Sequence, residues 1–135
     1  MKTFLLYHLP VLAYGAVILA VSSIPHLQTP QVRFLAFDKV AHFLEYALFS
    51  LLAFRSVSRL WNLSRNNRAL VVTFIILALF AVIDEYVQSL TPGRHPEVLD
   101  YLFDVLGGTL VLLLVWYRRR RDLRQTVETG GEPVQ

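Results

Sequence analysis

Cysteine is absent from this 135-residue sequence. Without a thiol, the chain has no disulfide framework, no thiolate metal site and no cysteine nucleophile. It also lacks a glycine-rich phosphate loop, a nucleophile elbow and a zinc-protease motif. These absences exclude the enzyme classes that are most easily recognised from a local motif.

Charge is scarce inside four long apolar runs. Hydrophobic residues make up 55% of the chain, above the roughly 45–50% of soluble domains, and the mean hydropathy is +0.48. Runs of this length are typical of bilayer-spanning helices rather than of a soluble core. We therefore predict an all-α, polytopic membrane protein with about four transmembrane helices in an antiparallel bundle.

The four runs set the predicted helix boundaries. One transmembrane domain covers residues 1–117, and its helices are predicted at residues 4–24, 38–54, 69–90 and 100–117. The second run is short for a span, so the residues just before it are predicted to add a helical turn or the bilayer to thin locally.

The two ends of the chain need separate interpretations. The first run is predicted to be a retained helix, with Pro10 in the early turns that tolerate proline. A signal peptide is the alternative, because Lys2 precedes the run and Ala20-Val21-Ser22 resembles a cleavage site. The charged, glycine-containing segment 118–135 is predicted to be a disordered cytoplasmic tail.

Arginines gather on one side of the predicted bundle. They lie between the second and third runs and after the fourth, at Arg55, Arg59, Arg65, Arg68, Arg124 and positions 118–121. Because positively charged connections stay in the cytoplasm, we predict a multi-pass protein of the inner or plasma membrane with both termini cytoplasmic. The excess of basic residues is then explained by the orientation of the protein in the membrane, and no nucleic-acid partner is predicted.

Most remaining polar residues fall at the opposite ends of the second, third and fourth helices. They are Asp38, Lys39, His42, Glu45, Tyr46, Asp84, Glu85, Gln88, Arg94, Asp100 and Asp104. A carboxylate held within the membrane costs about 2–4 kcal/mol unless it is paired or hydrated. These residues are therefore predicted to pair with one another, to line a hydrated pocket, or both.

The same residues carry a resemblance to the VanZ-like family of membrane proteins. The first signature is Asp38-Lys39-x-x-His42-Phe43-x-x-Tyr46, and the second combines Asp84-Glu85-x-x-Gln88, Pro92-Gly93-Arg94 and Asp100-x-x-x-Asp104-x-x-Gly107. Asp104 departs from the asparagine usual in the family and adds an acid. The founding member is associated with low-level teicoplanin resistance, so the resemblance implies an envelope context rather than a particular reaction.

Two groups of site residues are predicted. The acid–base cluster, which is the candidate catalytic group, consists of His42, Asp84, Glu85 and Asp104. The candidate binding residues are Asp38, Lys39, Tyr46, Gln88, Arg94 and Asp100. In this interpretation Asp38 orients the imidazole of His42, while Arg94 and Lys39 neutralise an anionic headgroup. Structural ion pairs, Asp38 with His42 and Asp84 with Arg94, are the alternative.

No metal site is predicted, because the spacing matches no established metal motif, and the sequence requires no cofactor. A divalent cation held by His42, Asp84, Glu85 and Asp104 would have oxygen-rich ligation, which suits Mg²⁺, Mn²⁺ or Ca²⁺.

The predicted function is a VanZ-like envelope protein whose outward-facing cluster binds or modifies a headgroup or a glycopeptide-type ligand and affects teicoplanin susceptibility. A membrane-embedded hydrolase or transferase acting on a lipid-linked substrate is the alternative, so the sequence leaves open whether the chain is an enzyme. A channel or transporter is disfavoured, because the charged groups stop in the outer part of the membrane and only an oligomer could conduct. The predicted partners are the bilayer and this ligand, and the oligomeric state stays open.

Overall fold

In the part of the chain that the structure describes, four helical segments are long enough to span a membrane. The computed structural model describes residues 1–25, 35–60, 67–94 and 96–128. The elements are a π-helical turn η1 (Phe4–His8), α1 (Leu9–Ser22), α2 (Leu35–Leu60), α3 (Arg68–Leu90) and α4 (Val98–Glu128). By length and composition, each of the four spans can cross a membrane. The predicted all-α bundle is confirmed.

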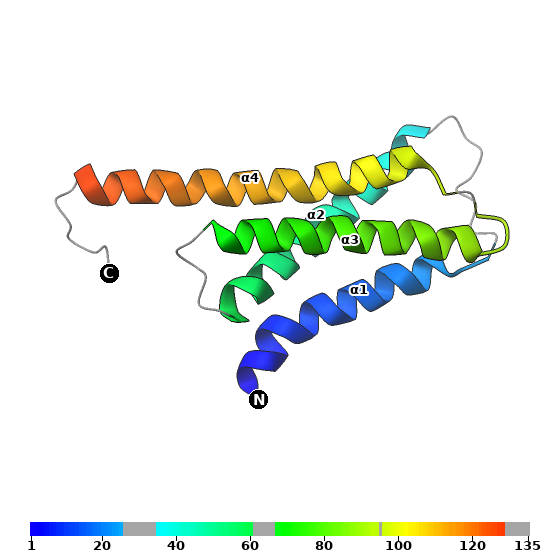
Figure 1. Ribbon diagram of the computed structural model, residues 1–135, viewed down its shortest axis with the longest axis horizontal. Coiled ribbons are helices and arrows are strands. Elements are labelled where there is room, and N and C mark those ends of the chain that lie inside the picture. The colour runs from blue at the N-terminus through cyan, green and yellow to red at the C-terminus, as the bar shows by residue number, and fades with distance from the viewer. Residues whose placement is uncertain (26–34, 61–66, 95, 129–135) are drawn as a thin grey trace.

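In Figure 1, α3 and α4 run in opposite directions along the long axis, whereas α2 crosses obliquely behind α3 and α1 is slanted. Within the described ranges, α2 packs against all three other helices, whereas α1 contacts α2 and α3 but not α4. The start of α1 and the end of α4 lie toward the same end of the bundle. The opposite end therefore brings together the end of α1, the start of α2, the end of α3 and the start of α4.

Helix α2 is longer than the predicted segment 38–54. It begins at Leu35 and ends at Leu60, which provides the extra length that a short span lacked. Arg55 to Leu60 contains neither glycine nor proline, so nothing in this segment ends the helix. The next helix, α3, does end at a stop signal: Thr91 is extended, with φ −91 and ψ 122, and it is followed by Pro92 and by Gly93, whose φ is 77.

The prediction of a disordered tail from residue 118 is wrong for residues 118–128. Helix α4 continues through Glu128, because this segment is rich in arginine, a strong helix former, and contains no glycine or proline. Extending an existing helix also avoids the unfavourable nucleation step. The rest of the predicted tail, residues 129–135, lies outside the described residues.

Two glycines bring α4 close to its neighbours. A Cβ at Gly107 would overlap the backbone carbonyl of Phe43 in α2, and a Cβ at Gly108 would overlap the side chain of Leu77 in α3. The hydroxyl of Ser50 donates a hydrogen bond to the carbonyl of Gly108 over 3.0 Å. Small residues at such contacts are typical of membrane bundles, where helices associate through close packing.

The bundle places apolar side chains outside and polar ones inside. Leu44 and Leu79 are each 60% exposed, whereas Asp84 is 1% and Asp104 0% exposed. The interior also holds aromatic rings, with Phe49 stacked on Phe80 at a centroid distance of 4.4 Å. An apolar exterior around buried charge is the arrangement that a surrounding bilayer stabilises.

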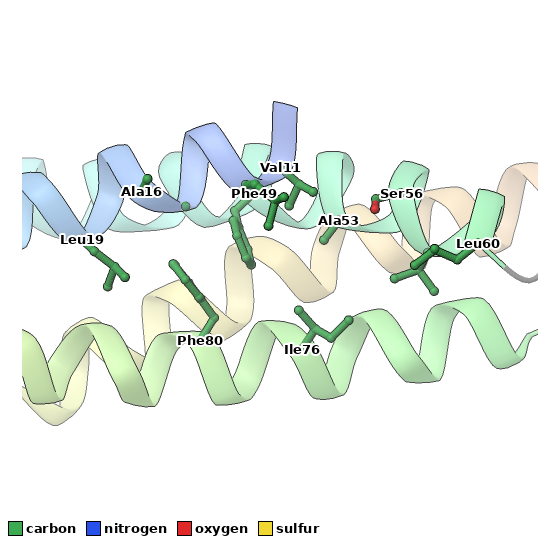
Figure 2. A pocket seen from close by; sticks show the side chains of 12 residues that line it. Val11, Ala16, Leu19, Phe49, Ala53, Ser56, Leu60, Ile76 and Phe80 are labelled. Atoms are coloured by element: carbon green, nitrogen blue, oxygen red, sulfur yellow. The ribbon is translucent and has the colours of Figure 1, made fainter. Parts of the chain in front are cut away.

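An apolar groove of about 490 Å³ lies between α1, α2 and α3. Figure 2 shows Phe49 and Phe80 pointing into this space from α2 and α3, with Leu19 of α1 alongside. Ser56 also borders it, but its hydroxyl is hydrogen-bonded to His8 over 2.8 Å. The groove offers space for hydrocarbon and no titratable group for chemistry.

Arginine contacts mark the end of the bundle where α2 ends. The guanidinium of Arg55 lies 4.9 Å from the ring centre of Tyr7, and that of Arg119 lies 4.6 Å from the ring centre of Phe54. Arg120 covers Trp116 at 4.1 Å. These cation–π contacts hold arginines of α2 and α4 beside aromatic residues, an arrangement typical of the boundary between membrane and water.

Candidate functional site

The helix ends opposite these arginines meet in a group of polar side chains, which we name the polar cluster. It consists of Ser22, Asp38, Lys39, His42, Glu45, Tyr46, Asp84, Glu85, Gln88, Arg94, Glu97, Asp100 and Asp104. All ten site residues predicted from the sequence belong to it. The structure therefore brings the predicted residues together.

Lys39 is held by three carboxylates. Its Nζ lies 2.8 Å from Glu97 Oε2 and 3.5 Å from Asp38 Oδ2, and it also pairs with Asp100 Oδ1. The side chain is buried, and an ammonium group has three hydrogens to donate. The charge of Lys39 is thus engaged within the protein, which weakens the prediction that it neutralises an anionic headgroup.

His42 pairs with Asp104 rather than with Asp38. The Nδ1 atom of His42 lies 2.9 Å from Asp104 Oδ1, and the carboxylate is completely buried. Asp38 instead faces Lys39. The prediction that Asp38 orients the imidazole is therefore wrong, because the close approach of α4 at Gly107 brings Asp104 to the same part of α2. A buried carboxylate in this position fixes the orientation of the imidazole ring.

Asp84 is bonded by Ser22 and not by Arg94. The Ser22 hydroxyl donates to Asp84 Oδ1 over 2.5 Å, and Gln88 Nε2 lies 3.5 Å from Oδ2. The Nη2 of Arg94 donates to the carbonyl of Val21 over 3.0 Å. The alternative of an Asp84–Arg94 ion pair is thus wrong: Arg94 caps the C-terminal end of α1, where the helix dipole favours a cation.

Several buried polar atoms in the cluster have no hydrogen-bond partner among the described residues. They are the hydroxyl of Tyr46, Oε1 of Glu85, Nε of Arg94 and Oδ2 of Asp104. The Tyr46 hydroxyl lies near the Asp84 carboxylate without reaching hydrogen-bond geometry. An unsatisfied buried polar group costs about 1–3 kcal/mol, so these atoms favour a further partner.

Negative charge exceeds positive charge in the cluster. Its seven carboxylates are Asp38, Glu45, Asp84, Glu85, Glu97, Asp100 and Asp104. Lys39 and Arg94 oppose them, together with His42 when its ring is protonated. Because buried charges are stable only when they are compensated, the cluster favours bound protons or a cationic partner.

A groove of about 370 Å³ leads to the cluster between α3 and the start of α4. Its lining consists of Val82, Glu85, Pro96, Glu97, Val98 and Tyr101. Val82 and Val98 are exposed on the outside of the bundle, so the groove can be reached from the surrounding phase. Glu85 and Glu97 belong to both the groove and the cluster, which connects the two.

The sequence matches the VanZ/LLP1 family over residues 5–119. The chain belongs to the VanZ/LLP1 family. The match includes α1 as well as the three helices that carry the signature residues. No curated protein matches the chain, and no solved structure matches it.

Two members of the cluster in this VanZ/LLP1 protein were missed by sequence reasoning. Ser22 was interpreted only as part of a cleavage-site alternative, yet it bonds Asp84 from α1. Glu97 was not singled out, yet it pairs with Lys39. The signal for Glu97 was an acid directly before the fourth apolar run, where a helix N-terminus favours negative charge. Ser22 left no comparable signal, because a serine at the end of an apolar run is common.

Proposed function

We propose that this VanZ/LLP1 protein binds an amphiphilic ligand of the cell envelope and that the polar cluster recognises a positively charged group on its head. The observation that carries this proposal is the groove bordered by Glu85 and Glu97, in a cluster whose carboxylates outnumber its lysine and arginine. Glu97 also pairs with Lys39, so Glu85 is the main carboxylate offered to the headgroup.

The excess of negative charge in the cluster supports a positively charged headgroup. Lys39 is already paired with Glu97, Asp100 and Asp38, so it offers little to a phosphate. Glu85 has a buried oxygen without a partner among the described residues. An ammonium group donates hydrogen bonds to carboxylates, and such charge-assisted bonds contribute about 1.5–3 kcal/mol. An amine-bearing headgroup therefore fits better than a purely anionic one.

The position of the groove supports an amphiphilic ligand. Apolar side chains of Val82, Val98 and Tyr101 share the lining with the two glutamates. A ligand can thus keep its hydrocarbon in the bilayer while its headgroup reaches the carboxylates.

The proposal places the polar cluster on the outer face and both termini in the cytoplasm. The clustering of arginines at the far end of the bundle supports this orientation, since positively charged connections are retained inside.

Lipid retention tests the proposed ligand class. The protein would be purified from membranes that contain phosphatidylethanolamine and phosphatidylglycerol, and bound lipids would be counted by native mass spectrometry. We expect the amine-bearing lipid to be enriched, and this enrichment to fall in Glu85→Gln and Glu97→Gln. The control is Asp122→Asn, which removes one carboxylate from the exposed far part of α4. Equal retention of both lipids, or retention unchanged in both glutamine variants, would overturn the proposal.

The family resemblance adds a cellular expectation. If the ligand belongs to the cell wall or to the outer leaflet, expression in a teicoplanin-susceptible host should raise the inhibitory concentration of teicoplanin. Glu85→Gln should lose this effect at equal expression, whereas Asp122→Asn should keep it. An inhibitory concentration that does not change on expression of the wild type would refute the link to teicoplanin.

A hydrolase or transferase acting on a lipid-linked substrate is the second candidate, and the buried His42–Asp104 pair favours it. In the hydrolytic case, His42 would take a proton from the water that attacks a headgroup ester and return it to the departing alcohol. His42→Gln should then abolish headgroup release while lipid retention persists. Release at the wild-type rate in this variant would eliminate His42 as the base.

A further inference from the structure

We infer that His42, Asp84 and Asp104 bind one divalent cation of the Mn²⁺ type. These three residues come from α2, α3 and α4, so the site would join three helices inside the bundle. One ligand atom from each lies within 4.8 Å of the other two. Asp84 is 1% exposed and Asp104 0%, so an ion here would be shielded from bulk water.

The spacing of the His42–Asp104 pair suits an ion. His42 Nδ1 and Asp104 Oδ1 are 2.9 Å apart. Two neighbouring ligands of an octahedral ion with bonds of about 2.1 Å lie about 3.0 Å apart. A cation could therefore take the place of the proton that joins the two atoms, with little movement of either side chain.

An independent observation also points to a ligand. Oδ2 of Asp104 and the hydroxyl of Tyr46 are fully buried and have no hydrogen-bond partner among the described residues. The Tyr46 hydroxyl lies near the Asp84 carboxylate and is in electrostatic range of Asp104. The second carboxylate oxygen of Asp104 and the nearby Tyr46 hydroxyl thus give a cation, and the water bound to it, partners that the protein alone leaves unused.

The surrounding contacts would hold the ligands in place. Ser22 and Gln88 both direct hydrogen-bond donors at Asp84, and such outer contacts orient a ligating carboxylate. A second group with similar spacing, formed by Asp38, His42 and Asp100, also lies within 4.8 Å. Asp38 and Asp100 are both engaged by Lys39, so the first group is the better site.

The donor set selects the kind of ion. Carboxylate oxygens suit Mg²⁺, Ca²⁺ and Mn²⁺, whereas imidazole suits transition metals. Mn²⁺ accepts both kinds of ligand. Two carboxylates and a neutral imidazole would neutralise its charge, which lowers the cost of burying the aspartates.

This inference goes beyond the proposed ligand and does not depend on it. The groove offers Glu85 and Glu97 to a headgroup, whereas the cation site uses none of the groove's lining residues. Glu85→Gln and Glu97→Gln should therefore keep the cation even when lipid retention is lost. A failure of one proposal can be told from a failure of the other.

Manganese titration provides the test. The full chain in lipid nanodiscs, stripped with chelator, would be titrated with Mn²⁺, and free Mn²⁺ would be followed by electron paramagnetic resonance. We expect one bound ion per chain, with affinity weakened at least about tenfold in Asp84→Asn and in Asp104→Asn. Asp122→Asn should bind as the wild type does. Circular dichroism and gel filtration would confirm that each variant is folded.

A spectroscopic readout on the wild type keeps the test independent of variant folding. The bound Mn²⁺ should show coupling to an imidazole nitrogen, and this signal should vanish in His42→Gln. If the wild type binds no Mn²⁺, or if the bound ion lacks nitrogen coupling, the inference is wrong. It is also wrong if folded Asp84→Asn and Asp104→Asn variants bind with unchanged affinity.

Discussion

At the scale of single residues, Gly107 of α4 lies closer to its neighbour, the backbone of α2, than Gly108 or Gly15 lies to its own neighbour. A Cβ at Gly107 would overlap the carbonyl of Phe43, which cannot move without shifting the helix, whereas a Cβ at Gly108 would meet the flexible end of Leu77. Gly15 faces Phe80 at distances closer to ordinary contact. The overlap that an added Cβ would cause therefore decreases in the order Gly107, Gly108, Gly15.

We expect Gly107→Ala to destabilise the protein by roughly 1–3 kcal/mol, as overpacked sites do. Gly108→Ala should have a smaller effect, and Gly15→Ala the smallest, because each substitution also gains about 1 kcal/mol of helix propensity. Unfolding in detergent micelles, followed by circular dichroism, would rank the variants. Equal stability of Gly107→Ala and Gly15→Ala would contradict the close approach of α4 to α2.

Lys39 provides a second prediction at this scale. Removing its charge in Lys39→Met leaves Asp38, Glu97 and Asp100 without their shared cation. Breaking a buried pair from one side typically costs about 3–5 kcal/mol. The same unfolding measurement should show this loss, while the exposed Arg118→Met, at the other end of the bundle, should change little. A Lys39→Met variant as stable as Arg118→Met would refute the compensating role of Lys39.

The residue scale is also where sequence reasoning met its limit. Membership of the polar cluster could be predicted, because charges inside apolar runs must meet one another. Which side chains of the cluster form hydrogen bonds with each other could not be predicted. Asp38 lies one turn from His42 on the same helix, yet Asp104 makes the hydrogen bond. Such pairing depends on the rotation and approach of α4, which Gly107 sets through a contact between distant parts of the chain.

At the scale of helices, the apolar runs predicted the number and order of the elements but not all of their ends. The length of an apolar run predicts which residues lie in the bilayer. The helix itself ends only at a residue that disfavours further helical backbone, such as proline or glycine. Helix α3 ends at the Thr91-Pro92-Gly93 turn, close to its predicted boundary. Helices α2 and α4 run past their last predicted apolar turns, because residues 55–60 and 118–128 contain no glycine or proline that would end a helix.

This continuation of α4 gives a prediction for the element. Residues 118–128 should show helical Cα chemical shifts by nuclear magnetic resonance in micelles, and their amides should exchange more slowly than those of an unstructured peptide. The reason is that the segment extends a stable membrane helix and needs no new nucleus. Random-coil shifts from residue 118 onward would instead support the disordered tail that composition predicts.

At the scale of the whole molecule, the bundle is polarised along its length. One end carries arginines beside aromatic rings, the middle is apolar, and the other end holds the polar cluster with its excess of carboxylates. Helix order and polarity could be predicted from the sequence. The groove at Glu85 and Glu97 could not, because it is formed by residues from α3 and from the segment before α4.

The proposed function requires the polar cluster to face the outside of the cell, and topology is the most direct test of that requirement. The chain has no cysteine, so single cysteines at Asn67, before α3, and at His95, between α3 and α4, would each be a unique label. Intact cells would be treated with a membrane-impermeant thiol reagent, with lysed cells as the control. We expect His95→Cys to be labelled in intact cells and Asn67→Cys only after lysis. The reverse pattern would place the cluster in the cytoplasm and contradict an envelope ligand.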